Sequence, residues 1–294
     1  MAQGAPPVGR VYQVAGRGLM LHHVGTGRPA VVVEAGGGNF GLDYLNIHAH
    51  IARFTTCVVY DRAGYGWSDP VEQPRSATAV NDDLRGLLAA AAVPAPYILV
   101  GHSLGGLYVR RYAQRFPGEV AGLVLVDPDH EDIRARMPAQ WQEMEDSVRA
   151  QLDRPPAPLS EEQLQQARGW FGQIFSTWPA SVREPLIDRH LDAQRARVGL
   201  EETRDWHSLY AEVQAGGDLP NVPLIVLTGA ALDPWPVAEQ VQRELIDTKR
   251  NVHAALAAST PHGQHRILDD VGHMITTHRP DAVVNAVHDI VTQL

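Results

Sequence analysis

Two residue types that build common kinds of site are almost missing from this 294-residue chain, which contains one cysteine, Cys57, and one lysine, Lys249. A single cysteine excludes a disulfide within the chain and a metal site built from several thiolates. We therefore expect a reducing, cytoplasmic environment, with Cys57 as an inert part of a buried strand. Because the other 24 of the 25 lysine and arginine residues are arginine, we attribute the scarcity of lysine to genome composition.

The sequence also has no long uncharged apolar run and no excess of positive charge. No helix is predicted to span a membrane, because no run of about 18 apolar residues without charges occurs. The first residues, MAQGAPPVGR, lack the basic start and apolar stretch of a secretory signal. The net charge of −9 argues against nucleic acid and anionic membranes as partners, since both require a basic face.

Short β-branched runs alternate with helical stretches, which predicts an α/β fold with a mostly parallel sheet. Most of the predicted strands are continuous apolar runs, as is typical of strands covered by helices on both faces. The strands are predicted at Val11–Val14, Met20–Val24, Ala30–Glu34, Thr56–Tyr60, Tyr97–Gly101, Gly122–Val126, Leu224–Thr228 and His265–Leu268, the first two forming an antiparallel hairpin. Helices are predicted at Leu42–Ala52, Ala77–Ala91, Leu104–Phe116 and Asp281–Gln293.

The strand pattern stops between about residues 131 and 219, where the composition is helical. We therefore predict a core domain of residues 1–130 and 220–294 and a helical cap, residues 131–219, inserted over the sheet. Within the cap, Pro155–Pro158 is predicted to form a turn. Four of the six tryptophans lie in the cap, and we expect them to line an apolar substrate pocket; the alternative is that they only pack the cap against the sheet. These are Trp141, Trp170, Trp178 and Trp206.

The segment Gly101–Gly106, with the sequence GHSLGG, matches the pattern G-x-S-x-G between a predicted strand and a predicted helix. A sharp turn in this context holds the serine hydroxyl clear of the sheet at a helix N-terminus, where developing negative charge is favoured. The alternative is a tight turn with an incidental serine. The strand-to-helix context favours Ser103 as a nucleophile.

A serine nucleophile requires a base, and His273 follows the last predicted strand in the chain order serine, acid, histidine. His102 is expected to have a packing role, and His130 is the next candidate for the base.

Two aspartates are candidates for the acid that orients this base. Asp127 directly ends a strand and is slightly favoured, while Asp233 lies in the loop after the next strand. The aspartate that is not the acid is expected to be structural, as a turn carboxylate or as a helix N-cap before a proline.

A tetrahedral intermediate requires hydrogen-bond donors for its oxyanion. The backbone N–H of Leu104, directly after the nucleophile, is the first candidate. The second is expected from the loop Ala35–Asn39, whose three consecutive glycines let the backbone turn an amide inward. Gly37 is preferred and Gly38 is the alternative. A phosphate-binding loop is less consistent with the sequence, because neither a G-K-[ST] ending nor a G-x-G-x-x-G pattern is present.

Together these segments resemble the α/β-hydrolase superfamily over nearly the whole chain. The resemblance also rests on Asp61–Asp69, which is similar to the D-x-x-G-x-G-x-S loop of capped members, on Leu123–Asp127 and on the Gly272-His273 pair. It implies an eight-stranded sheet, a cap after the sixth strand and a cofactor-free Ser-His-Asp mechanism. The acid follows the seventh strand in most members, which favours Asp233, and the sixth in some, which favours Asp127. Many members carry His-Gly where this chain has Glu34-Ala35.

The resemblance implies a serine hydrolase, carboxylesterase-like or lactonase-like, that acts on an ester or related acyl bond of a largely apolar small molecule. Epoxide hydrolases and haloalkane dehalogenases of this superfamily use an aspartate where this chain has Ser103. Hydroxynitrile lyases of this superfamily share the serine turn but usually carry a lysine in the cap. The predicted cap of this chain has no lysine, which argues against that activity. The alternatives are a ligand-binding or signalling homologue with slow turnover, or a lyase or perhydrolase that uses the same triad.

Overall fold

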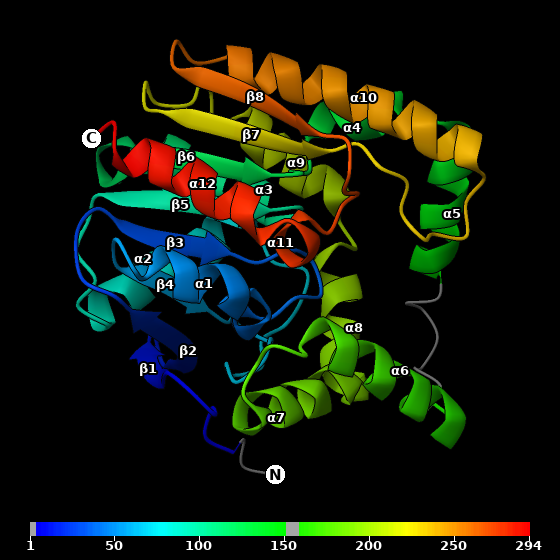
Figure 1. Ribbon diagram of the computed structural model, residues 1–294, viewed down its shortest axis with the longest axis horizontal. Helices are drawn as coiled ribbons and strands as arrows, with labels where there is room; N and C mark the ends of the chain where they lie inside the picture. The colour runs from blue at the N-terminus through cyan, green and yellow to red at the C-terminus, as the bar shows by residue number, and fades with distance from the viewer. Residues whose placement is uncertain (1–3, 151–158) are drawn as a thin grey trace.

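The computed structural model describes residues 4–150 and 159–294, so the turn predicted at Pro155–Pro158 lies outside the described residues. An eight-stranded sheet in the order β1-β2-β4-β3-β5-β6-β7-β8 forms the centre of the molecule (Figure 1). Strands β1 and β2 form the predicted antiparallel hairpin, β2 pairs antiparallel with β4, and the remaining pairings are parallel. The strands are β1 (Arg10–Val14), β2 (Arg17–Val24), β3 (Ala30–Glu34), β4 (Cys57–Tyr60), β5 (Tyr97–His102), β6 (Val120–Val126), β7 (Leu224–Gly229) and β8 (Gly263–Leu268). The predicted mostly parallel α/β fold is confirmed.

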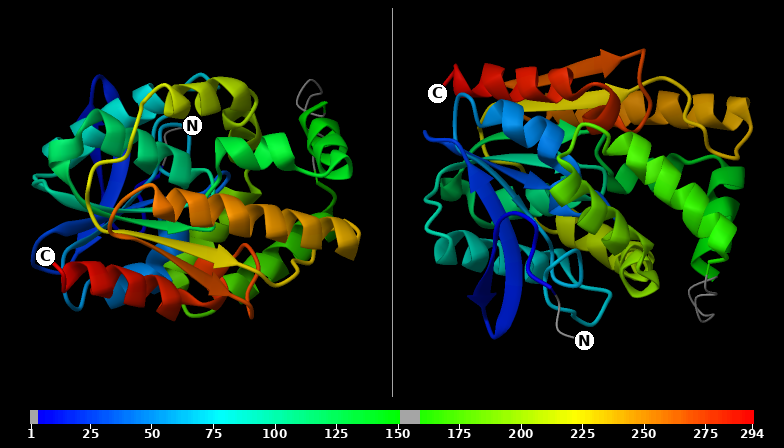
Figure 2. Two further views of the ribbon diagram at one scale, coloured as in Figure 1. Left: turned by 90° about the horizontal axis from the view of Figure 1, so that it is seen from above. Right: turned by 60° about the horizontal axis from the view of Figure 1, so that its bottom comes forward.

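Helices cover both faces of the sheet, and successive strand residues alternate between the two faces. Val31 and Val33 of β3 pack on one side, while Ala30 and Val32 pack on the other. The first side holds α1 and α12, and the second holds α2, α3 and α10 (Figure 2). Their bounds are α1 (Leu45–Ile51), preceded by the 3₁₀ turn Gly41–Tyr44, α12 (Pro280–Val291), α2 (Ala77–Ala90), α3 (Gly105–Arg115) and α10 (Glu239–Ala258).

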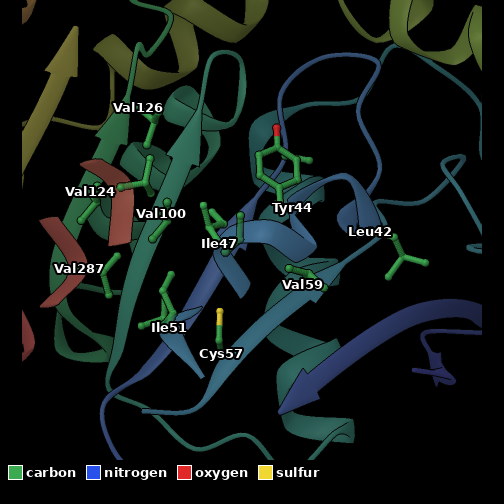
Figure 3. Close-up of a cluster of buried hydrophobic side chains, with 14 of the residues drawn as sticks. Leu42, Tyr44, Ile47, Ile51, Cys57, Val59, Val100, Val124, Val126 and Val287 are labelled. Carbon is green, nitrogen blue, oxygen red and sulfur yellow. The ribbon is translucent and has the colours of Figure 1, made fainter. Parts of the chain in front are cut away.

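The side of the sheet covered by α1 holds the larger hydrophobic cluster, part of which is shown in Figure 3. Ile47 and Ile51 of α1 pack there against Cys57 and Val59 of β4, and all four side chains are inaccessible to solvent. Burial raises the pKa of the Cys57 thiol. Cys57 therefore fills space in the core, as the sequence predicted.

Helix α10 was not predicted from the sequence, although it is a continuous helix of 20 residues between β7 and β8. Its buried face carries Val241, Leu245, Val252 and Leu256 at helical spacing. The same face also carries polar side chains, which hide the apolar pattern. These are Gln242, Lys249 and His253.

Only helices occur between β6 and β7 in the described part of this segment. They are α4 (Glu131–Arg136), α5 (Ala139–Ala150), α6 (Glu161–Ile174), α7 (Ala180–Leu191), α8 (Ala193–Glu202) and α9 (Trp206–Gln214). Figure 1 shows α5, α6 and α8 beyond the carboxyl ends of the parallel strands. The domain boundaries at residues 131 and 219 stay a prediction. None of the helices in the two described ranges combines the length and apolar character needed to cross a bilayer.

Candidate active site

Ser103 occupies the turn between β5 and α3, in a backbone conformation with φ of +52°. Three backbone hydrogen bonds hold it there. Its N–H donates to the carbonyl of Val126 at 3.1 Å, and its own carbonyl accepts from Gly106 at 2.8 Å and from Asp129 at 2.9 Å. The turn therefore presents a partly exposed serine side chain at the carboxyl end of the sheet.

Glycines on both sides of Ser103 make this turn possible. A Cβ atom at Gly101 would lie 2.6 Å from the carbonyl oxygen of Gly105. A Cβ atom at Gly105 would lie 2.4 Å from the carbonyl oxygen of Glu34. Since real Cβ atoms do not approach so closely, β5, α3 and the end of β3 can meet here only through glycine.

The imidazole ring of His273 is hydrogen-bonded to the carboxylate of Asp127. Its Nδ1 lies 2.6 Å from Asp127 Oδ2, and the carboxylate also accepts from the Gly229 N–H at 3.1 Å and from Lys249 Nζ at 2.8 Å. The aspartate is fully buried, which alone would raise its pKa, but Lys249 and His273 outweigh burial and hold the pKa of Asp127 well below its usual range. Asp127 is therefore an ionised partner for the imidazole.

Asp233 binds the backbone of the same histidine. Its two carboxylate oxygens accept the N–H of His273 at 3.1 and 3.0 Å. The alternative role predicted for Asp233, a helix N-cap, is wrong, because α10 begins only at Glu239. The two aspartates therefore fix His273 from different directions, Asp127 through the ring and Asp233 through the main chain.

His102 contacts His273 as well, so the packing role predicted for His102 is incomplete. The ring centroids are 5.0 Å apart, and His102 Nε2 lies 3.2 Å from the His273 carbonyl oxygen. On the other side, the Tyr44 hydroxyl accepts the N–H of Gly36 at 2.8 Å and lies 2.8 Å from His102 Nδ1. Since burial, helped by His273, lowers the pKa of His102 to about 3, the ring is neutral and accepts from Tyr44 while donating to His273. No motif in the sequence indicates this link.

His130, the second candidate for the base, serves its own helix. Its Nδ1 accepts the backbone N–H of Asp132 at 3.1 Å and so caps α4. Burial lowers the pKa of His130 to about 4. The ring is therefore used locally, at the start of the segment between β6 and β7.

The glycine loop after β3 and the turn after β5 each bring one backbone amide close to Ser103. The N–H of Gly38 donates to the Tyr65 hydroxyl at 3.4 Å. Within the described residues, the amides of Gly37 and Leu104 donate no hydrogen bond. Gly37 also faces Leu104, since a Cβ atom on Gly37 would lie 3.5 Å from Leu104 Cδ2. The amide of Gly38 is engaged by Tyr65, and the choice of Gly37 over Gly38 as the second donor stays a prediction.

A buried ionic cluster supports this glycine loop. Arg62 donates to the carbonyls of Ala35 at 2.7 Å and Gly36 at 3.0 Å. It also pairs with Glu34 at 2.9 Å and with Glu202 of α8 at 2.8 Å, and all three charged side chains are buried. The sequence offered one signal for the cluster, namely Glu34-Ala35 in place of His-Gly, but nothing indicated that Glu202 reaches it.

The four tryptophans between β6 and β7 lie in three places. Trp170 and Trp178 line a cavity of about 1230 Å³, together with Trp235 and Met274. Trp235 lies 6.0 Å from the His273 ring, and Asp233 and Met274 also line the cavity, whereas Ser103 and His273 are not among its lining residues. Two others pack elsewhere: Trp141 against Trp235, with ring centroids 5.1 Å apart, and Trp206 against Tyr210, at 5.6 Å.

In the described ranges no cluster of His, Cys, Asp or Glu is arranged to hold a metal ion.

Known proteins resemble the chain in sequence and in fold. An uncharacterized protein of Schizosaccharomyces pombe is 42% identical over 82 residues, which cover 28% of this chain and 15% of that protein. The chain spans well under half the length of the first curated relatives it matches. An esterase structure from Thermogutta terrifontis is 19% identical, with 96% of this chain and 97% of that chain covered and a TM-score of 0.63. A mutant epoxide hydrolase from Vigna radiata is 17% identical, with 97% and 98% covered and a TM-score of 0.72.

At such identities the solved structures establish the fold, and the family follows from the sequence itself. The model of the alpha/beta hydrolase family matches residues 19–286. This span begins in β2, ends in α12 and includes every site residue described above. The chain therefore belongs to the alpha/beta hydrolase family.

Proposed function

We propose that the protein is a serine hydrolase that cleaves an ester or a related acyl bond. One observation carries the proposal: Ser103 stands on a left-handed strand-to-helix turn, and at the same sheet edge the His273 ring is bonded to a buried, ionised Asp127. A nucleophile, a base and an orienting acid are the three groups that acyl transfer requires.

The proposed mechanism assigns one task to each group. His273 accepts the proton of the Ser103 hydroxyl as the serine oxygen attacks the acyl carbon. Asp127 orients the ring and stabilises the imidazolium that forms. The amides of Leu104 and Gly37 stabilise the oxyanion, and each such donor contributes about 3 kcal/mol to the transition state. His273 then protonates the leaving group, and a water molecule repeats the sequence on the acyl-enzyme.

In this proposal the acid is Asp127, and Asp233 holds the main chain of the base. The short contact between Asp127 and the His273 ring supports the first role. The two contacts from Asp233 to the His273 amide support the second.

The cavity whose wall includes Trp235, a neighbour of His273, supports a bulky, mainly apolar substrate. Its wall includes Trp170, Trp178 and Trp235, and its volume of about 1230 Å³ is large for a small-molecule site. We therefore propose that Trp170 and Trp178 contact the acyl or alcohol part of the substrate. Trp141 and Trp206 would stabilise the cap. The fold shared with the Thermogutta terrifontis esterase supports this class, whereas the serine at position 103 does not suit an epoxide hydrolase.

The test is hydrolysis of p-nitrophenyl esters of increasing acyl length by wild type and Ser103→Ala. We expect turnover that favours medium or long acyl chains and that disappears in Ser103→Ala. A fluorophosphonate should add one mass adduct to wild type, on the peptide that contains Ser103. Ser208→Ala, which changes an exposed serine on α9, should behave as wild type.

Two results would contradict the proposal. Turnover that persists in Ser103→Ala would remove the serine mechanism. No turnover on any ester, together with no adduct, would favour a ligand-binding homologue. Product analysis separates hydrolysis from lyase or perhydrolase chemistry, because only hydrolysis yields the free acid and alcohol in water alone.

A further inference from the structure

Lys249, the only lysine of the chain, contacts the carboxylate of Asp127 that also binds the His273 ring. Lys249 is on the buried face of α10, and its ammonium group donates to Asp127 Oδ2 at 2.8 Å. The same oxygen accepts from His273 at 2.6 Å. A second contact, from Lys249 to the Gly229 carbonyl at 3.4 Å, directs the ammonium group toward the end of β7.

We propose that Lys249 is a positioning residue that keeps Asp127 ionised and lowers the affinity of the Asp127–His273 pair for a proton. The inference rests on the proposed hydrolase function, because it concerns the base of that mechanism. A permanent cation that shares a carboxylate with an imidazole competes with the imidazolium for the negative charge. His273 is therefore free to act as a base at a lower pH than Asp127 alone would allow.

The burial of this group of side chains makes the effect of the charge large. Asp127 is inaccessible to solvent, and the side chain of Lys249 is about 10% exposed. The ammonium group and the ring both contact the carboxylate directly, at 2.8 and 2.6 Å, so solvent screens these two interactions weakly. A lysine on the surface would have no such influence.

Other titratable side chains face the pair, and their arrangement leaves Lys249 as the cation that matters. Burial lowers the pKa of His102 to about 3 and of His253 to about 4, so both are neutral in the working range. Burial raises the pKa of Asp129 to about 6. The groups are His102 at the end of β5, Asp129 after β6, Asp233 after β7, His253 on α10 and, through Thr228, His265 on β8.

The test measures protonation directly, by NMR titration of the histidine rings, with the His273 signal identified by its loss in His273→Gln. In Lys249→Gln and Lys249→Met we expect the midpoint of the His273 titration to rise by roughly one pH unit. The acidic limb of the hydrolysis profile should move up by the same amount. Lys249→Arg keeps the charge and should restore the wild-type midpoint.

Arg243→Met is the matched control, because it removes one positive charge from an exposed position of the same helix. It should leave the midpoint unchanged. A wild-type midpoint in folded Lys249→Gln, or an equal shift in Arg243→Met, would overturn the inference. The NMR readout needs no turnover, so an inactive protein with a shifted midpoint would refute only the hydrolase proposal. If the enzyme is active and depends on Ser103 but the His273 midpoint in Lys249→Gln equals that of the wild type, only the role of Lys249 is refuted.

A second measurement requires no substitution. Because the chain has one lysine, selective ¹⁵Nζ labelling gives a single signal. If Lys249 and His273 share a carboxylate, the Nζ shift should follow the His273 titration with the same midpoint. An Nζ signal that does not respond across that range would contradict the coupling even if every variant failed to fold.

Discussion

At the residue scale, the proposed nucleophile and its proposed acid share an uncommon backbone conformation. Ser103 has φ of +52° and Asp127 has φ of +39°, and neither is glycine. Such conformations cost about 1–3 kcal/mol each and persist only where neighbours hold them. Here the amide of Ser103 is held by Val126 and the amide of Asp127 by Leu227, so both turns are fixed by the adjacent strands.

Substituting the two aspartates separately tests their division of labour. We expect Asp127→Asn to lower kcat by about 10⁴-fold, because the amide can no longer stabilise an imidazolium or fix the ring tautomer. Asp233→Asn should cost less than about tenfold, since its amide oxygen still accepts the His273 N–H and one such bond contributes about 1 kcal/mol. Both losses are measured as the ratio of wild-type to variant kcat on the ester that the wild type hydrolyses fastest. A larger loss in Asp233→Asn than in Asp127→Asn would reverse the assignment.

The sequence was sufficient to propose Ser103 and His273 but not to choose the acid. A motif and a chain order locate the first two. Asp127 and Asp233 follow neighbouring parallel strands, whose carboxyl ends meet at one edge of the sheet. Both aspartates therefore reach His273, and only the direction of each side chain distinguishes ring from main chain.

At the scale of elements, buried charged groups hold α8 against the core in addition to the apolar packing of Val198. Glu202, at its last position, binds Arg62 through two nitrogens, at 2.8 and 2.9 Å, and the hydroxyls of Tyr65 and Tyr108 donate to it. Arg62 in turn holds the carbonyls of the glycine loop. A change in α8 is therefore transmitted to the loop that carries the proposed oxyanion donor.

We expect Glu202→Gln to destabilise the protein by about 3 kcal/mol, because it breaks a buried pair that Arg62 needs. It should also lower kcat more than it changes KM, since the loop and not the pocket is released. Urea unfolding and ester kinetics measure the two effects. Glu201→Gln, which breaks a partly exposed pair one residue away, should cost less than about 1 kcal/mol. Equal effects in the two variants would mean that the cluster has no special role.

Helix α10 shows why element prediction failed in one place. Its buried face includes Gln242, Lys249 and His253, each of which binds a group at the sheet edge or in the loop after β7. These contacts form only after β6, β7 and α10 have assembled. These polar side chains interrupt the apolar periodicity that indicates a buried helix. Their presence on the buried face is explained only by their contacts in the folded structure.

At the scale of the whole molecule, several histidines are buried in the neutral state. Burial lowers the pKa of His48 and His102 to about 3 and of His130 and His253 to about 4. In the unfolded chain these rings titrate near their ordinary value of 6.5. The unfolded state thus binds more protons below that pH, and the stability they confer is present above about pH 6.5 and is lost as the pH falls toward 3. Asp129, whose pKa burial raises to about 6, acts in the opposite direction, and so does Glu34, whose pKa burial also raises.

The free energy of unfolding should therefore fall steeply from pH 7 to pH 5, each buried histidine contributing up to about 1.4 kcal/mol per pH unit. Urea unfolding of the wild type at pH 7, 6 and 5 measures this slope. In His48→Gln one titrating ring is gone, so the total fall to pH 5 should be about 2 kcal/mol smaller, whatever the variant's stability at pH 7. His50→Gln changes an exposed histidine of the same helix and should retain the wild-type slope. A wild type equally stable at pH 7 and pH 5, or identical slopes in the two variants, would show that these rings are not held neutral by the fold.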